Sequence, residues 1–76
     1  MNRKQRTEIS EMVATLRGMC DNITAIEADE QEKYDNLPPG LQEGEQGTEI
    51  EDGMENLCDA RFSIESAIES LGTIAG

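Results

Sequence analysis

The chain lacks the residues that usually stabilise very small folds. Its 76 residues contain no histidine, no tryptophan and only two cysteines, Cys20 and Cys58. A disulfide framework would need several cysteine pairs, and a structural zinc site would need a Cys-x-x-Cys pair or histidines. We therefore expect no metal and no cofactor. A chain of this length buries a modest share of its surface, so self-association is the remaining source of stability.

Long apolar runs are also missing. No stretch approaches the roughly 18 apolar residues that span a membrane. The basic start of the chain, 1–8, is not followed by the apolar core of a signal peptide. We expect a cytoplasmic protein with no membrane contact. Its two cysteines would then stay unpaired and behave as small hydrophobes.

The residues of an active site are scarce. Histidine, the usual acid–base group near neutral pH, is absent. The serines fall on predicted helices with no base within sequence reach, and paired carboxylates need a cleft that two helices cannot form. We predict that the protein is not an enzyme and that it has no catalytic residues.

Apolar residues at spacings of three and four predict a first helix at about 3–35. Two rows of residues seven apart indicate a coiled-coil-like seam, which Val13 and Cys20 widen. These rows are Ile9, Leu16 and Ile23, and Met12, Met19 and Ile26. Asn2 is the expected N-cap, with Gln5 completing a capping box.

A turn at about 36–47 follows, because Pro38 and Pro39 stop the first helix. Leu41 is expected to cover the open end at this turn. The capping box Thr48–Glu51 then predicts a second helix at about 48–75. Its apolar stripe is Ile50, Met54, Leu57, Ile64, Ile68, Leu71 and Ala75.

These elements predict one all-α domain, 1–76, folded as an antiparallel two-helix hairpin. One hairpin covers only one side of each apolar stripe, whereas two hairpins packed together cover both. We therefore expect a homo-oligomeric helical bundle, a dimer or higher.

The net charge of −11 is confined to one part of the chain. Residues 27–59 hold twelve acids and one base, which gives −11, and the remaining five acids and five bases sum to zero. This distribution argues against direct binding of nucleic acid. It places the whole net charge at the turn end of the hairpin.

Arg61 interrupts the apolar stripe of the second helix, and Glu27 interrupts that of the first. One interpretation is an Arg61–Glu27 ion pair that fixes the register, and the other is an arginine that lines an anion pocket between subunits. Arg3, Lys4 and Arg6 stand where the helix dipole disfavours cations. Either the second helix brings Glu65 and Glu69 beside them, or several copies form a phosphate-binding patch.

The segment 29–42 resembles a turn found in small acidic helical proteins that phages and mobile elements of Gram-positive, often gut, bacteria encode. In those proteins an acidic helix end runs into a Y/F-D-N-L/I-P-x-x-L-Q turn, which 34–42 matches here. Pro39 and Gly40 stand where many relatives have Glu or Ser after the first proline. The resemblance implies a phage context and assigns no site.

That context leads to three hypotheses for function. The first is a protein of the host cell cytoplasm that counters antiviral defence by sequestering a small anionic nucleotide signal between subunits. Its binding residues would be Arg61, Arg3, Lys4, Arg6 and Tyr34. The second is a nucleic-acid-mimicking inhibitor of a host defence or DNA-binding protein. Its acidic contacts would be Glu30, Glu32, Asp35, Glu49, Asp52 and Glu55. The third is a helical assembly adaptor with Phe62 and Leu41 as contacts.

Overall fold

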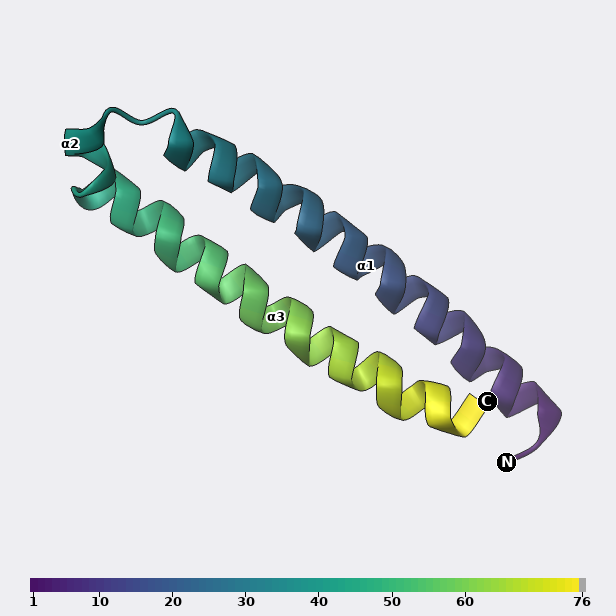
Figure 1. Cartoon of the computed structure of the whole chain (residues 1–76). Coiled ribbons are helices and arrows are strands. Elements are labelled where there is room, and N and C mark those ends of the chain that lie inside the picture. Colours follow the sequence, from purple (N-terminus) through teal and green to yellow (C-terminus); the bar gives the residue numbers. More distant parts are fainter. Residues whose placement is uncertain (76) are drawn as a thin grey trace.

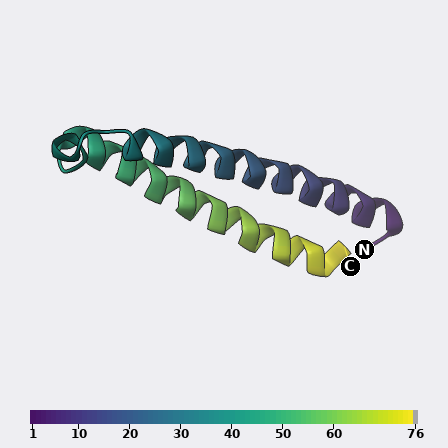
Figure 2. The ribbon, with the colours of Figure 1, turned by 45° about the horizontal axis from the view of Figure 1, so that its top comes forward.

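A computed structural model describes residues 1–75. It contains three helices, α1 (Arg3–Asp35), α2 (Pro39–Gln42) and α3 (Glu45–Ala75), joined by short connections. The prediction of an all-α fold is confirmed. α1 and α3 contact each other along their length and run in opposite directions, with α2 at the closed end (Figure 1). The view in Figure 2 shows the same two helices side by side.

The molecule is long and thin, with extents of 58 × 14 × 13 Å. Its radius of gyration is 17.2 Å, whereas a compact domain of this length would have a value of about 11 Å. Among residues 1–75, Cys20 is the one hydrophobic side chain that is buried. Two helices in one layer therefore leave the apolar residues only partly covered.

Each long helix uses a strict heptad repeat to face the other, with the a and d positions partly or fully buried. In α1 these residues are Ile9, Val13, Leu16, Cys20, Ile23, Glu27, Glu30 and Tyr34. In α3 they are Ile50, Met54, Leu57, Arg61, Ile64, Ile68, Leu71 and Ala75. Such a spacing keeps one stripe of each helix in contact over many turns. We call this contact the seam.

The expected composition of the seam was partly wrong. Val13 and Cys20 lie in it, whereas Met12, Met19 and Ile26 are 52%, 46% and 47% exposed. The apolar stripe of α1 is wider than one seam, so two choices of seam fitted its sequence. In the structure, the row that faces α3 consists of Val13, Cys20, Glu27 and Tyr34.

The start of α1 agrees with the sequence. The Asn2 side chain accepts a hydrogen bond from the Gln5 backbone N–H at 2.8 Å, and the Asn2 backbone N–H donates to the Gln5 side chain at 3.2 Å. The predicted capping box is therefore confirmed. α1 ends at Asp35, just before the residues that the two prolines exclude from a helix.

The turn is more ordered than expected. α2 lies within it and starts at Pro39, whose ring suits the first position of a helix. α3 begins at Glu45 rather than at Thr48, and the Thr48 hydroxyl donates to the Gly44 carbonyl instead of capping the helix. Leu41 was expected to cover the helix pair at this turn, but it does not, since it is 46% exposed.

Gly47 and Gln42 hold this turn together. A Cβ atom on Gly47 would lie 1.9 Å from the Gln42 carbonyl oxygen, so the close approach requires glycine. The Gln42 side chain donates a hydrogen bond of 2.9 Å to the Tyr34 carbonyl in the last turn of α1. One residue of α2 thus contacts both long helices.

Candidate functional site

Arg61 lies in the seam of α3, opposite Glu27 of α1. Its Nε donates a hydrogen bond of 2.8 Å to Glu27 Oε1, and one terminal nitrogen donates at 3.2 Å to Glu65. The Arg61 and Glu27 side chains are 24% and 22% exposed. The guanidinium also lies 5.1 Å from the centre of the Phe62 ring. The hydrogen bonds to Glu27 and Glu65 raise the pKa of Arg61 above its ordinary value.

The predicted ion pair between Arg61 and Glu27 is therefore present within the chain. Each residue interrupts an apolar row, and each supplies the charge that the other needs when water is partly excluded. With two carboxylates on its guanidinium, Arg61 has little capacity left for an anionic ligand. The inter-subunit anion pocket stays a prediction.

The other residues predicted to bind a nucleotide are not brought together. Arg3, Lys4 and Arg6 begin α1, while Tyr34 lies about 45 Å further along the same helix. Glu65 does not reach the three cations, because it pairs with Arg61 and lies in a hollow beside Arg17. Among residues 1–75, Arg3, Lys4 and Arg6 form no ion pair. One hollow is lined by Ser10 and Val13 together with Gly72 and Ala75, so the end of α3 lies beside Ser10 and α1 extends beyond it.

Tyr34 is half-buried in the seam near the turn. The Glu51 carboxylate of α3, which accepts a hydrogen bond from the phenol, raises the pKa of Tyr34 above its ordinary value, and burial and the charge of Glu51 add to this. Its main chain accepts from Gln42. The structure therefore places Tyr34 among residues of the turn and not beside Arg61.

The residues of the alternative acidic site do gather at the turn end. Five of them are exposed, and Glu30 is half-buried and accepts a hydrogen bond of 2.9 Å from Lys33. The exposed ones are Glu32, Asp35, Glu49, Asp52 and Glu55. Binding of a basic partner at this end stays a prediction.

A surface that the sequence interpretation missed lies along one side of the seam. It consists of the residues that directly precede the a positions, which are Val13, Cys20 and Glu27 in α1 and Arg61, Ile68 and Ala75 in α3. Because the helices are antiparallel, these residues lie on the same side of the pair. We call this surface the apolar lateral face and define it as Met12, Met19, Ile26, Ala60, Ala67 and Ile74. All six are exposed.

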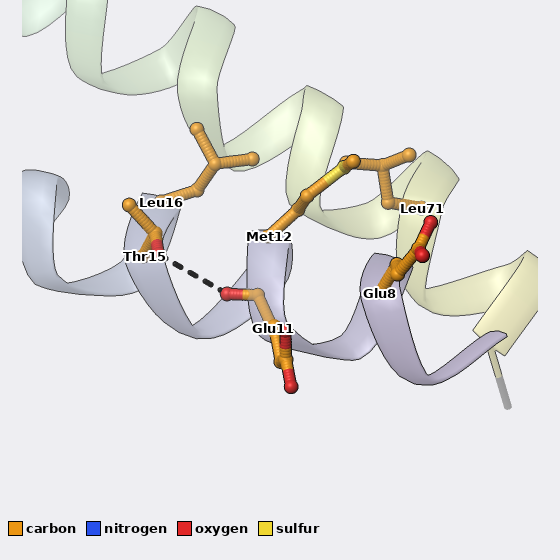
Figure 3. Close-up of a pocket in the computed structure, with 6 residues that line it drawn as sticks. All are labelled: Glu8, Glu11, Met12, Thr15, Leu16 and Leu71. Atoms are coloured by element: carbon orange, nitrogen blue, oxygen red, sulfur yellow. Dashed lines mark hydrogen bonds between the residues drawn. The ribbon is translucent and has the colours of Figure 1, made fainter. Parts of the chain in front are cut away.

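The middle of the apolar lateral face is bordered by uncharged residues, whereas Glu8 and Asp29 occupy the bordering positions at its two ends. The uncharged residues that border it, one helical turn further from the seam, are Thr15, Asn22, Asn56, Ser63 and Ser70. A hollow of about 550 Å³ lies at one end of this face, lined by Met12, Leu16 and Leu71 together with Glu8, Glu11 and Thr15. Figure 3 shows Met12 reaching from α1 toward Leu71 of α3.

The opposite side of the seam is polar. Its residues follow the d positions and are Ser10, Arg17, Thr24, Gln31, Glu51, Cys58, Glu65 and Gly72. Two hollows on this side combine residues of both helices, Arg17 with Glu65 and Ser10 with Gly72. The sequence signal that separates the two sides is the row of residues seven apart, Met12, Met19 and Ile26, which ends at Lys33.

Residues 1–75 contain neither a cluster of metal-ligating side chains nor a disulfide. Within residues 1–75, no three His, Cys, Asp or Glu side chains form a group that could hold a metal ion. Cys20 and Cys58 are both free thiols. In the same described part of the chain, neither long helix has an apolar segment that could cross a membrane.

These features define an elongated, all-α protein with one apolar and one polar side. Comparison with protein-family models, with curated proteins and with solved structures finds no match to this chain. The surfaces described above are therefore the features from which a function is inferred.

Proposed function

We propose that the protein is a non-enzymatic assembly module, a helical hairpin that binds a second copy of itself through the apolar lateral face. The observation that carries this proposal is the uncharged, exposed row from Met12 to Ile26 beside the row from Ala60 to Ile74. Contiguous apolar surface of this kind marks an interaction site in a small protein. Two hairpins joined in this way make a four-helix bundle.

The incomplete core supports the same proposal. Each apolar residue of the seam is shared by two helices only, and Cys20 is the one such residue that is buried among 1–75. A second pair of helices packed on the apolar lateral face would cover Leu16 and Leu71, two d positions of the seam, on the side that faces solvent in a single copy. The added apolar burial would stabilise the fold and the assembly together.

The arrangement supports assembly over capture of an anionic nucleotide. Arg61 is already engaged by Glu27 and Glu65, and Tyr34 lies at the acidic turn end, where a negative ligand is repelled. The third hypothesis drawn from the sequence, an assembly adaptor, is the one that we carry forward. Its contact surface is the apolar lateral face rather than Phe62 and Leu41.

Light scattering coupled to size-exclusion chromatography tests the proposal. We expect the wild-type chain to show twice the 8.4 kDa of one copy, or a higher multiple. Ala67→Glu places a charge in the centre of the apolar lateral face and should weaken association by about 100-fold. Ala25→Glu makes the same change at an exposed position away from the seam, on the outer surface of α1, and should leave the mass unchanged.

A wild-type chain that stays at 8.4 kDa across the micromolar range would overturn the proposal. So would equal association of Ala67→Glu and Ala25→Glu. Circular dichroism of both variants shows whether a loss of mass reflects a lost interface or a lost fold.

A further inference from the structure

Two copies could cover their apolar lateral faces in two orientations. With the long axes parallel, both turn ends lie at the same end of the bundle. With the axes antiparallel, the turn ends lie at opposite ends. Both orientations are two-fold symmetric and both bring apolar residues together, so hydrophobic contact alone does not select one of them.

In the antiparallel orientation, the apolar residues of one copy's apolar lateral face lie opposite apolar residues of the other copy's face. A two-fold axis that passes beside Met19 and Ala67 brings each of these residues against its own counterpart. The same axis places Met12 against the other copy's Ile26 and Ala60 against the other copy's Ile74. These matches follow from the equal spacing of seven residues in both rows.

Charge distinguishes the two orientations. The turn half, residues 27–59, carries the entire net charge of −11, and the rest of the chain is neutral overall. Parallel copies would place two such halves side by side, which is strongly unfavourable. Antiparallel copies instead place each turn half beside the neutral half of the other copy.

The N-terminal cations add a second electrostatic argument. Arg3, Lys4 and Arg6 form no ion pair among residues 1–75, and they extend beyond the end of α3. About the axis at Met19, these residues fall beside positions 32–35 of the other copy. The exposed carboxylates of Glu32 and Asp35 are located there. In the parallel orientation the cations of the two copies would instead lie next to each other.

We infer that the partner of the apolar lateral face is a second copy in antiparallel orientation, with the basic start of each α1 bound beside the acidic end of the other α1. This inference rests on the proposed self-association and adds the geometry of the pair. The two acidic turn ends then lie at opposite ends of the dimer.

Spin labels measure the orientation directly. In a Cys20→Ala/Cys58→Ala background whose dimeric mass has been verified, Gln46→Cys places one label per copy at the start of α3. The helix rise predicts about 60 Å between the two labels in the antiparallel dimer, and about 15 Å in a parallel one, where helices pack side by side. A short distance would overturn the inference and leave the proposed self-association intact. A monomeric mass of the wild-type chain would overturn both.

A second measurement uses the chain with its native cysteines. The triple variant Arg3→Gln/Lys4→Gln/Arg6→Gln should raise the dissociation constant about tenfold at low salt, as expected for the loss of a few exposed ion pairs. The difference from wild type should shrink at high salt. Unchanged or tighter association of the triple variant would contradict the antiparallel pair, because it would mean that the cations repel each other or contact nothing.

Discussion

The two halves of the molecule share one seam, but they differ in the contacts that cover it. The turn half, residues 27–59, is closed by its own chain, since α2 connects the last turn of α1 to the first turn of α3. Its remaining surface is acidic and solvated. The terminal half, residues 1–26 and 60–75, has no such closure and carries the apolar lateral face.

A heptad repeat therefore specifies a contact between helices but not how many helices complete the bundle. The a and d positions continue through both halves without a break. On one side of the seam the flanking residues change, from the apolar lateral face in the terminal half to Lys33 and Gly53 in the turn half. The ion pair of Glu27 and Arg61 lies where the two halves meet.

The largest effect is expected from a change that breaks the closure of the turn half. Gly47→Ala puts a methyl group where the Gln42 backbone lies, at 1.9 Å from its carbonyl oxygen. Because backbone cannot move aside cheaply, we expect a loss of about 2 kcal/mol in the free energy of unfolding. Chemical denaturation followed by circular dichroism measures it, at one fixed protein concentration.

Gly18→Ala is the matched control in the terminal half. Gly18 is exposed in α1, and nothing would lie within 4 Å of its added methyl group. The same substitution should therefore stabilise the protein there by about 0.5–1 kcal/mol through helix propensity. If both variants shifted the unfolding free energy in the same direction, the close contact of Gly47 with Gln42 would not be a constraint on the fold.

A smaller effect is expected at the boundary between the halves. Arg61→Met leaves Glu27 without its partner in the seam and should lower the stability of the fold. Glu27→Leu/Arg61→Met replaces the whole pair with apolar groups of similar volume. We expect the double variant to unfold at a higher denaturant concentration than the single variant, and at least as high as wild type.

The single variant Glu27→Leu completes this double-mutant cycle. Additive changes in the unfolding free energy would mean that the two side chains do not interact. Because charged groups in a seam also set register, the double variant should be checked for its oligomeric mass. A changed mass with retained stability would show that the pair specifies the arrangement rather than the stability.

Much of this fold could be predicted because the signals are local. The all-α class follows from apolar spacings of three and four, the start of α1 from Asn2 and Gln5, and its end from the two prolines. The pair of Glu27 and Arg61 was also predictable. Each is a charge in an apolar row, and antiparallel helices bring the two rows together.

The remaining features depend on tertiary contact. The sequence of α1 offers two rows of apolar residues, and only the position of α3 decides that Val13 and Cys20 face it. Thr48 has the residue type of an N-cap, yet the packing of Gly47 against Gln42 extends α3 by one turn before it. The apolar lateral face therefore became visible only when the seam was known.

The smallest effect is expected on the pKa of Tyr34. It tests whether one neighbouring carboxylate or the total negative charge of the protein raises this pKa. Tyr34 is the one tyrosine and tryptophan is absent, so ultraviolet absorbance of the phenolate reports this residue alone. We expect its pKa above the ordinary 10.0, because the phenol donates to the Glu51 carboxylate. Since the folded state favours the neutral phenol, this contribution to stability is complete below the unfolded pKa and is lost as pH rises through the folded pKa. Glu51→Gln should lower the midpoint, whereas Glu8→Gln, at the other end of α1, should leave it unchanged. Equal midpoints in the two variants would mean that Tyr34 senses the total charge of the protein rather than its neighbour on α3.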